Sequence, residues 1–234
     1  MLGVLNDRTA DGRDISAVWD AGFELPAGLN PIHGAFCEPL ACCLHGLDVA
    51  RIQPGGSVAV LGGGVIGMLM VQLARLAGAS TVILCTRQQP RRELALQIGA
   101  THALDPGAAD LTTAIAGPGG IVPGGVDVTL ECAGVPETFR QSIAVVRRGG
   151  AVVVFGVMPK GESVGVEPFD LLFREIRIEG AYLNPLTHGR AARMVARREL
   201  ELDRLVSRVI GLDELPQVIA APAGFGEIKT VVVP

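Results

Sequence analysis

Charged side chains are scarce in this sequence. Asp, Glu, Lys and Arg together make up 19% of the 234 residues, and the formal net charge is only −4. A chain without a basic excess has no electrostatic footprint for nucleic acid, so we expect no nucleic-acid partner. Hydrophobic residues make up 49%, which argues against intrinsic disorder and allows a sizeable core.

Disulfide and targeting signals are also missing. The five cysteines are an odd number and show no disulfide-like spacing, which favours reduced thiols and a cytoplasmic location. The first fourteen residues, MLGVLNDRTADGRD, carry charges early and contain no apolar run of the kind found in signal peptides. We therefore expect a cytoplasmic protein that is not secreted.

Residues 53–74 contain no charged side chain, which raises the alternative of a membrane span. The run includes Pro54 and six glycines, which break helices and mark turns. A buried strand, a glycine turn and a buried helix explain the run better. We expect no association with a membrane.

Apolar segments alternate with helical patterns through the middle of the chain. Strands are predicted at 57–62, 81–85, 102–105, 126–134, 151–156 and 176–183, and helices at 65–77, 89–99, 109–117 and 136–150. The strands are almost continuously apolar, so both faces of their sheet should be covered. This order predicts an α/β fold with a doubly wound parallel sheet.

The pattern changes at both ends of this region. After Leu183 we predict a charged helix over 188–206, a second helix over 212–222 and a last strand over 228–234. The first 35 residues are polar and irregular. We therefore expect a nucleotide-binding unit at 46–183, preceded by a partial unit at 1–45 and followed by a C-terminal segment at 184–234.

A glycine motif lies between the first predicted strand and helix. The stretch VAVLGGGVIG contains Gly62-x-Gly64-x-x-Gly67, which is typical of a dinucleotide-binding Rossmann fold in this context. Gly62 would allow a sharp turn, Gly64 the approach of a pyrophosphate, and Gly67 close packing of helix on strand. Amides at the helix start, Val65 and Ile66, would hold the phosphates. The alternative is a glycine-rich turn without a ligand.

The end of the second strand indicates which dinucleotide binds. NAD enzymes usually carry an acid about 20 residues after the motif, but none occurs from Thr81 to Arg92. Thr86 occupies that place, and Arg87 and Arg91 follow it. Guanidinium groups can bind a 2′-phosphate bidentately, so we expect NADP, with NAD as second choice. Alternatively these arginines, Arg92 above all, only solvate the next helix.

The stretch AFCEPLACCLHG, residues 35–46, contains residue types that bind zinc. Glu38, Cys42 and His45 form a site only if all three side chains converge. The alternative is a helix whose small cysteines face the core. We favour the second interpretation, with Glu38 as one residue of an incomplete metal site.

Four motifs in this order resemble the medium-chain zinc-dependent alcohol dehydrogenases, especially the sorbitol and threonine dehydrogenase branch. They are CEPLACCLHGLDVARIQPGGSVAVLGGGVIGMLMVQLARLAGASTVILCTR, ELALQIGATHALDP, DVTLECAGVPETF and GEIKTVVVP. The resemblance covers about residues 24–234. It implies an oxidoreductase that transfers hydride between a secondary alcohol or polyol and NAD(P), with zinc polarising the carbonyl.

The resemblance also implies residue roles. It places Glu38 near the catalytic zinc or its bound water, and Lys229 near the cofactor phosphates. Further residues would lie along the cofactor: Cys132, Ala133, Gly134, Gly156, Val157, Tyr182, Leu183 and Asn184.

One part of the family pattern is missing. Members carry an N-terminal catalytic domain that supplies a zinc-binding cysteine and histidine, whereas residues 1–23 contain neither. We therefore expect an N-terminally truncated chain in which 1–45 is a remnant of the GroES-like catalytic domain. The uncovered surface should make the chain a homo-oligomer or prone to association. A non-catalytic dinucleotide-binding module and a zinc-free reductase remain as alternatives.

Overall fold

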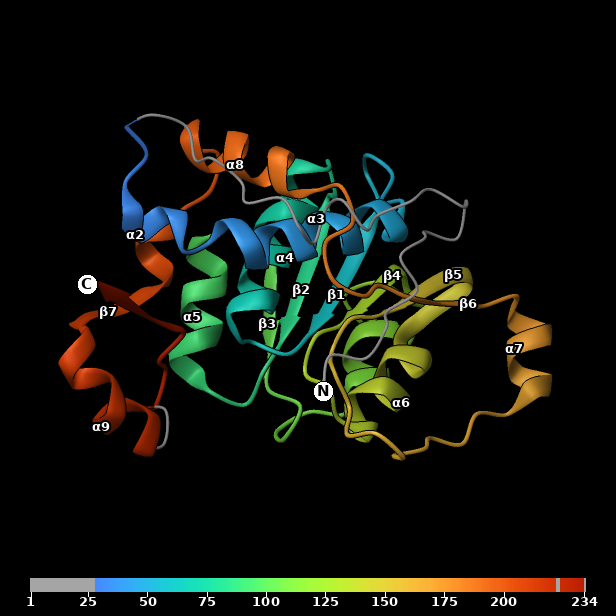
Figure 1. The fold of residues 1–234 in the computed structure, drawn as a ribbon. Helices are drawn as coiled ribbons and strands as arrows, with labels where there is room; N and C mark the ends of the chain where they lie inside the picture. Colours follow the sequence, from blue (N-terminus) through green and yellow to red (C-terminus); the bar gives the residue numbers. More distant parts are fainter. Residues whose placement is uncertain (1–27, 222–223, 234) are drawn as a thin grey trace.

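The computed structural model describes residues 28–221 and 224–233. It contains a six-stranded parallel sheet with helices on both faces, and a separate two-stranded sheet near the C-terminus (Figure 1). The predicted α/β fold with a doubly wound parallel sheet is therefore confirmed. The strands of the large sheet are β1 (Ser57–Leu61), β2 (Thr81–Cys85), β3 (His102–Leu104), β4 (Val126–Glu131), β5 (Val146–Val154) and β6 (Arg177–Gly180).

The large sheet has the strand order β3-β2-β1-β4-β5-β6. The chain therefore builds outward from β1 to β3 and then crosses to begin again at β4, beside β1. Leu61 aligns with Cys85 of β2 and with Glu131 of β4, so three strands end at the same edge. In such sheets ligands bind outside the carboxyl ends of the strands at this switch point.

Both faces of the sheet are buried. Val58 and Val60 of β1 belong to the core beneath α4 (Val65–Leu76) and α5 (Gln89–Gln97). Ala59 and Leu61 point to the other face, where α6 (Pro136–Val145) and a short π-helical turn, Thr112–Ala116, pack. This two-sided burial explains why the strands are apolar at successive positions rather than at alternate ones.

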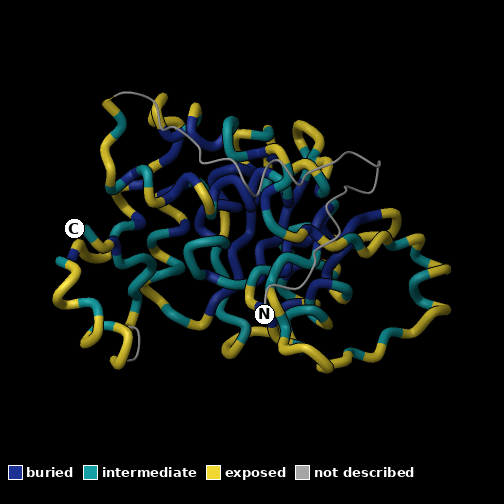
Figure 2. Tube along the Cα trace, viewed as in Figure 1, coloured by how far each residue is buried: buried dark blue, intermediate teal, exposed yellow. Residues whose placement is uncertain are grey.

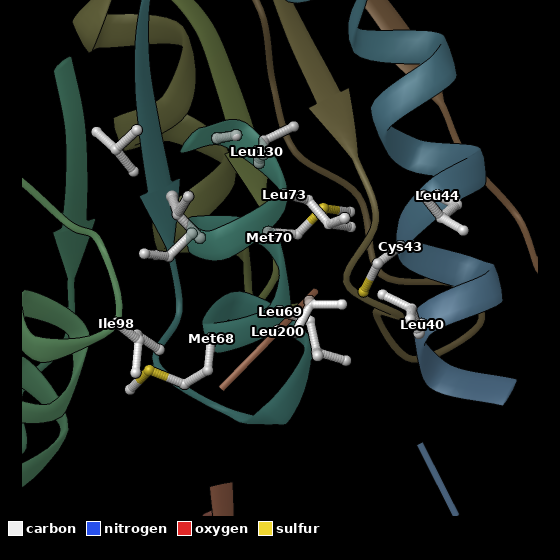
Figure 3. Packing of buried hydrophobic residues seen from close by; sticks show 14 of the residues in the cluster. Leu40, Cys43, Leu44, Met68, Leu69, Met70, Leu73, Ile98, Leu130 and Leu200 are labelled. Atoms are coloured by element: carbon white, nitrogen blue, oxygen red, sulfur yellow. The ribbon is translucent and has the colours of Figure 1, made fainter. Parts of the chain in front are cut away.

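The cysteine-rich stretch lies in α3 (Cys37–Ala50), which packs against α4 and α8 (His188–Ala196). Figure 3 shows Cys43 turned from α3 toward α4, in the cluster that contains Leu69 and Met70. Cys43 is fully buried, as the core interpretation of this helix expects. Helix α3 runs continuously through residues 45 and 46, so the expected boundary between two units falls inside one helix.

The C-terminal segment adds a second, smaller sheet. Strand β7 (Val206–Gly211) pairs in parallel with β8 (Lys229–Val233), and the short helix α9 (Leu215–Ala220) lies between them in sequence. Leu202 and Leu205, just before β7, join the main core. Much of this segment, near the C-terminus in Figure 2, is coloured as exposed. Its exposed apolar residues include Val209, Leu212, Ile219 and Phe225.

The predicted helix over 188–206 is wrong beyond Ala196, where α8 ends. Two hydrogen bonds close the helix, from the Arg198 amide to the Val195 carbonyl and from the Glu199 amide to the Met194 carbonyl. This is a Schellman motif in which Arg198 has φ +54°, a conformation usually left to glycine. Because no glycine marks this end, the pattern concealed both it and the following strand β7.

Other boundaries also differ from the prediction. The helix expected over 136–150 ends at Val145, because Val146 is buried and pairs with Val126 of β4 as the first residue of β5. The stretch 126–134, expected as a strand that ends in a turn, is a strand up to Glu131, in agreement with that prediction. The helix expected over 109–117 is only the π-helical turn, and α7 (Pro168–Arg174) and the four-residue α2 (Pro31–Gly34) were not predicted.

Among the described residues, no helix is both long and apolar enough to cross a membrane. The uncharged run 53–74 is divided between a turn, β1, the glycine turn and most of α4. Its apolar character follows from burial in the protein core.

Asp127 joins the beginnings of three strands. Its carboxylate accepts hydrogen bonds from the Ser57 amide and hydroxyl, both at 2.7 Å, and from the Arg147 guanidinium at 2.7 Å. Partial burial acts to raise the pKa of Asp127, but the hydrogen bonds from Ser57 and Arg147 outweigh it and lower the pKa. The ionised carboxylate therefore stabilises the fold.

We predict that Asp127→Asn lowers the free energy of unfolding by about 1 kcal/mol at pH 7, a value reduced for the exposure of the pair. The pKa of Asp127 is lower in the folded protein than in the unfolded chain, where it is about 3.9. The ionised carboxylate therefore contributes its full stabilisation above about pH 3.9, and this stabilisation is lost as the pH falls through the pKa of the folded state. The difference between variant and parent should therefore shrink below about pH 4 in urea titrations. Asp170→Asn, which breaks an ion pair within α7, is the control and should change stability by under about 0.5 kcal/mol.

Candidate functional site at the carboxyl edge of the sheet

The glycine turn after β1 brings three backbone segments close together. Gly62 has φ +120°, and a Cβ there would lie 2.9 Å from the backbone nitrogen of Ala133. A Cβ on Gly67 would lie 1.8 Å from the carbonyl oxygen of Gly62, so α4 rests directly on the turn. Neither position has space for any side chain. The first and third glycines therefore have the roles predicted for them in turn and packing.

The second glycine faces open space. Gly64 is the N-cap of α4, and a Cβ there would meet no atom within 4 Å. The amides of Val65 and Ile66 belong to the first turn of α4, where backbone N–H groups have no partner within the helix. That turn contains no acidic side chain. An anion can therefore approach these amides at the positive end of the helix dipole.

A buried glutamate organises the turn after β4. One carboxylate oxygen of Glu131 accepts hydrogen bonds from the amides of Ala133 and Gly134, both at 2.9 Å, and from the Thr138 hydroxyl at 2.6 Å. Its other oxygen is buried without a partner among the described residues. The burial of Cys132 raises the pKa of its thiol, with a smaller effect from Glu131. Residues Cys132, Ala133 and Gly134 thus form a fixed turn beside the glycine turn.

The ends of β4 and β5 interlock. Gly134 has φ +68°, and a Cβ there would lie 2.7 Å from the carbonyl oxygen of Val157. A Cβ on Gly156 would lie 2.1 Å from the amide nitrogen of Gly134. Val157 itself is 83% exposed, an unusual state for an aliphatic side chain at the end of a core strand. The edge thus ends in an uncovered apolar side chain.

The end of β2 lies beside the glycine turn. Thr86 is buried, and a Cβ on Gly63 would lie 2.7 Å from its hydroxyl oxygen. Arg87 follows as an exposed residue. Thr86 and the glycine turn are therefore neighbours in space.

The two later arginines have different surroundings. Arg92 donates hydrogen bonds to the carbonyls of Thr86 and Arg87 and forms an ion pair with Asp105. It therefore fastens the end of β2 to the start of α5. Arg91 instead donates to the carbonyl of Glu227. Burial lowers the pKa of Arg91, against a smaller opposing effect of Glu227.

Lys229 lies at the start of β8, where its ammonium group stands 5.4 Å from the centre of the Phe36 ring. Phe36 is fully buried and immediately precedes α3. A cation over an aromatic ring is stabilised by the ring quadrupole. This contact ties the end of the chain to the region of the Glu38 helix.

Glu38 lies in the first turn of α3. It accepts hydrogen bonds from the Cys42 thiol at 3.1 Å and from the Asn184 side chain at 3.4 Å. Burial, reinforced by the nearby Glu38, raises the pKa of Cys42 to about 12. Leu183, before the buried Asn184, has φ +57°. The structure therefore brings Glu38 and Asn184 together, although they are far apart in sequence.

Glu38, Cys42 and His45 do not combine into a metal site. Within residues 28–221 and 224–233, no group of three His, Cys, Asp or Glu residues could hold a metal ion. The Cys42 thiol faces Glu38 as a hydrogen-bond donor, and burial lowers the pKa of His45. The described residues do not fit a zinc ion by themselves, so no chemical step is assigned to one.

The sequence interpretation missed Glu131 and Gly63. Glu131 was included in a strand, although an acid at the end of an otherwise apolar strand signals that its charge has a specific partner. Gly63 was passed over as the variable position of the motif, yet the adjoining Thr86 leaves no space for a side chain there.

The strand order, the glycine turn and the open helix N-terminus are those of a Rossmann-like fold. The sequence pattern of the zinc-binding dehydrogenases matches residues 65–197, which is more than half of the chain. The chain belongs to that family.

Several known proteins resemble this chain. A structure described as a zinc-binding dehydrogenase from Sinorhizobium meliloti 1021 bound to NADP has a TM-score of 0.89 and 60% identity, covering 91% of this chain and 62% of its own. D-arabinitol dehydrogenase 1 of Uromyces fabae is 30% identical over 84% of this chain and 57% of its own length. Sorbitol dehydrogenase of Bacillus subtilis (strain 168) is 28% identical over 92% of this chain and 61% of its own.

These comparisons confirm the predicted resemblance to zinc-dependent alcohol and polyol dehydrogenases. The chain spans about 60% of the length of these relatives. Residues of the relatives outside that span have no counterpart in the aligned part of this chain.

We predict that Glu131→Ala lowers the free energy of unfolding by about 3 kcal/mol, because two backbone amides, one of them buried, and the Thr138 hydroxyl lose their shared acceptor. Thr138→Val removes one of these hydrogen bonds and is the matched control, with an expected loss of about 1 kcal/mol. Denaturant titrations measure both values. Equal losses in the two variants would show that the carboxylate does not organise the turn.

Proposed function

We propose that this chain binds NADP at the carboxyl edge of the large sheet. The observation that carries the proposal is the open space at Gly64, directly before the uncapped amides of Val65 and Ile66. A pyrophosphate fits such a position because no side chain blocks it and the helix dipole attracts its charge. The close packing at Gly62 and Gly67 holds this turn in place.

The phosphorylated dinucleotide is favoured by the charges after β2. Thr86 lies where a carboxylate would otherwise repel a 2′-phosphate, and the exposed Arg87 follows it. Arg91 is the second candidate cation, since its guanidinium is hydrogen-bonded to a neutral carbonyl rather than to an acid. NAD is the second choice. That the Sinorhizobium structure is described as bound to NADP supports the same assignment.

Further along the same edge of the sheet, we assign the nicotinamide to the interlocked ends of β4 and β5. The turn Cys132, Ala133 and Gly134 and the neighbouring Gly156 offer backbone against which a ring can lie. Val157 offers an exposed apolar side chain. Leu183 and Asn184 complete this end, and Lys229 is assigned to the phosphates as a cation near the start of α3.

For the whole protein we propose hydride transfer between a secondary alcohol or polyol and the bound NADP. The names of the relatives, D-arabinitol dehydrogenase 1 and sorbitol dehydrogenase, support this substrate class. The contribution of the described residues is to bind the dinucleotide and fix the face of its nicotinamide. Glu38, held by Cys42 and Asn184, is the candidate residue facing the substrate side.

A second candidate function is dinucleotide binding without catalysis. The observation that favours it is that no group of three metal-ligating side chains occurs in the part of the chain that the structure describes. Zinc analysis together with turnover of a polyol panel distinguishes the two. Stoichiometric zinc and turnover support the enzyme, whereas NADP binding without either supports the module.

We also propose that the chain associates through its C-terminal elements. Leu212, Ile219 and Phe225 are each more than 60% exposed, more than a monomer of this size usually leaves uncovered in one segment. Sedimentation of the purified chain tests the association, and a monodisperse monomer contradicts it.

The five unpaired thiols support a reducing, cytoplasmic environment.

We predict that the purified chain binds NADP at least about tenfold more tightly than NAD, and that Arg87→Ala weakens NADP binding about tenfold with NAD unchanged. The reason is that only the 2′-phosphate distinguishes the two ligands. Isothermal titration of both dinucleotides, with metal analysis of the same sample, is the measurement. Arg197→Ala, which removes an exposed arginine just after α8, is the control and should leave both affinities unchanged.

A further inference from the structure

The loop before β8 lies against the turn between β2 and α5. The side-chain oxygen of Gln88 accepts a hydrogen bond from the Gly226 amide at 2.8 Å, and Arg91 donates to the carbonyl of Glu227. We call this pair of contacts the C-terminal clasp. Its two partners are more than 130 residues apart in sequence. The C-terminal loop therefore holds the turn between β2 and α5 in place.

The clasp depends on a glycine. Gly226 has φ +81°, and a Cβ there would lie 3.1 Å from the Cβ of Pro90. Both the backbone conformation and the nearness of Pro90 disfavour any other residue. The loop therefore approaches α5 as closely as its backbone permits.

Glu227 keeps the loop in shape. Its carboxylate accepts hydrogen bonds from the Thr230 hydroxyl and the Arg208 guanidinium, both at 2.6 Å, and from the Gly224 amide at 2.8 Å. These contacts, that of Thr230 first, lower the pKa of Glu227 to about 2. The side chain is thus ionised and fully engaged within its own loop. Arg208 balances the charge of the Glu227 carboxylate, and Arg91 donates its hydrogen bond to the neutral backbone carbonyl of Glu227.

Arg91 has a hydrogen-bond donor without a partner among the described residues. Its Nε is buried and has no partner among the described residues, while the Nη2 is fixed by the clasp. A buried donor without an acceptor costs free energy, and an incoming phosphate oxygen would remove that cost. A guanidinium fixed at one nitrogen also loses less conformational freedom when it binds a phosphate.

We infer that the C-terminal clasp is a specificity-determining element that positions Arg91 for the 2′-phosphate of NADP. The inference rests on the proposed NADP-binding function. Gln88, Gly226 and the Glu227 carbonyl are positioning groups that act through Arg91. Gln88, Gly226 and the Glu227 carbonyl therefore influence the choice between NADP and NAD without themselves touching either ligand.

Gly226→Ala tests this inference in the full chain. It should weaken NADP binding about tenfold, the effect of losing one charge-assisted hydrogen bond, while NAD binding changes less than about twofold. Gly55→Ala is the matched control, because Gly55 has φ +83° in the turn before β1 and a Cβ there would meet no atom within 4 Å. The control should leave the ratio of the two dissociation constants unchanged.

A double-mutant cycle separates positioning from general loosening. In an Arg91→Leu background, Gly226→Ala should cause no further loss of NADP affinity. An additive loss, or an equal loss for NADP and NAD, overturns the inference. If Gly226→Ala does not fold, Gln88→Leu, which removes the acceptor and keeps the glycine, is put through the same cycle and the same outcomes decide.

The NADP and NAD affinities of the parent chain show whether a negative result contradicts this inference or the function on which it rests. If the parent binds neither dinucleotide, or binds both equally, the proposed NADP function fails. If the parent prefers NADP and the clasp variants keep that preference, the function stands and the inference alone fails.

Discussion

Backbone segments at the carboxyl edge of the sheet approach one another more closely than any side chain allows, and the rest of the site depends on this approach. The turn at Gly62 touches the segment at Cys132 and Ala133, and α4 rests on the carbonyl of Gly62 through Gly67. Because these contacts are made by main-chain atoms, the open N-terminus of α4 is fixed by the sheet itself. A phosphate-sized ligand can then meet amides that need no rearrangement.

The acidic and basic side chains around this edge face different surroundings. The carboxylate of Glu131 is turned inward to the amides of Ala133 and Gly134. Of the cations after β2, Arg92 pairs with Asp105, whereas Arg87 is exposed and Arg91 is hydrogen-bonded to a neutral carbonyl. A carboxylate bonded to backbone amides contributes to rigidity, and cations without acidic partners keep their charge available for an anion. This division favours a polyanionic ligand over a neutral one.

Much of the fold could be predicted because local pattern and tertiary burial agree. After their first residues, Ser57 and Thr81, the strands β1 and β2 are apolar at every position, which only a sheet covered on both faces requires. Prediction failed where the local signal was missing or a tertiary contact decided. The end of α8 is closed at Arg198 without the glycine that usually marks such an end. Strand β5 begins at Val146 because that residue pairs with Val126, a partner that cannot be identified from the residues beside Val146.

Short-range patterns are enough to predict the parallel sheet, the glycine turn and the missing acid after β2, because each is a property of neighbouring residues. Which side chains meet across the chain depends on tertiary packing. In the folded chain Glu38 is hydrogen-bonded to Asn184, Cys43 is buried in the core, and the loop at Gly226 contacts the segment that carries Arg91. Contacts of this kind depend on how distant elements pack. Spacing along the chain carries no record of that packing.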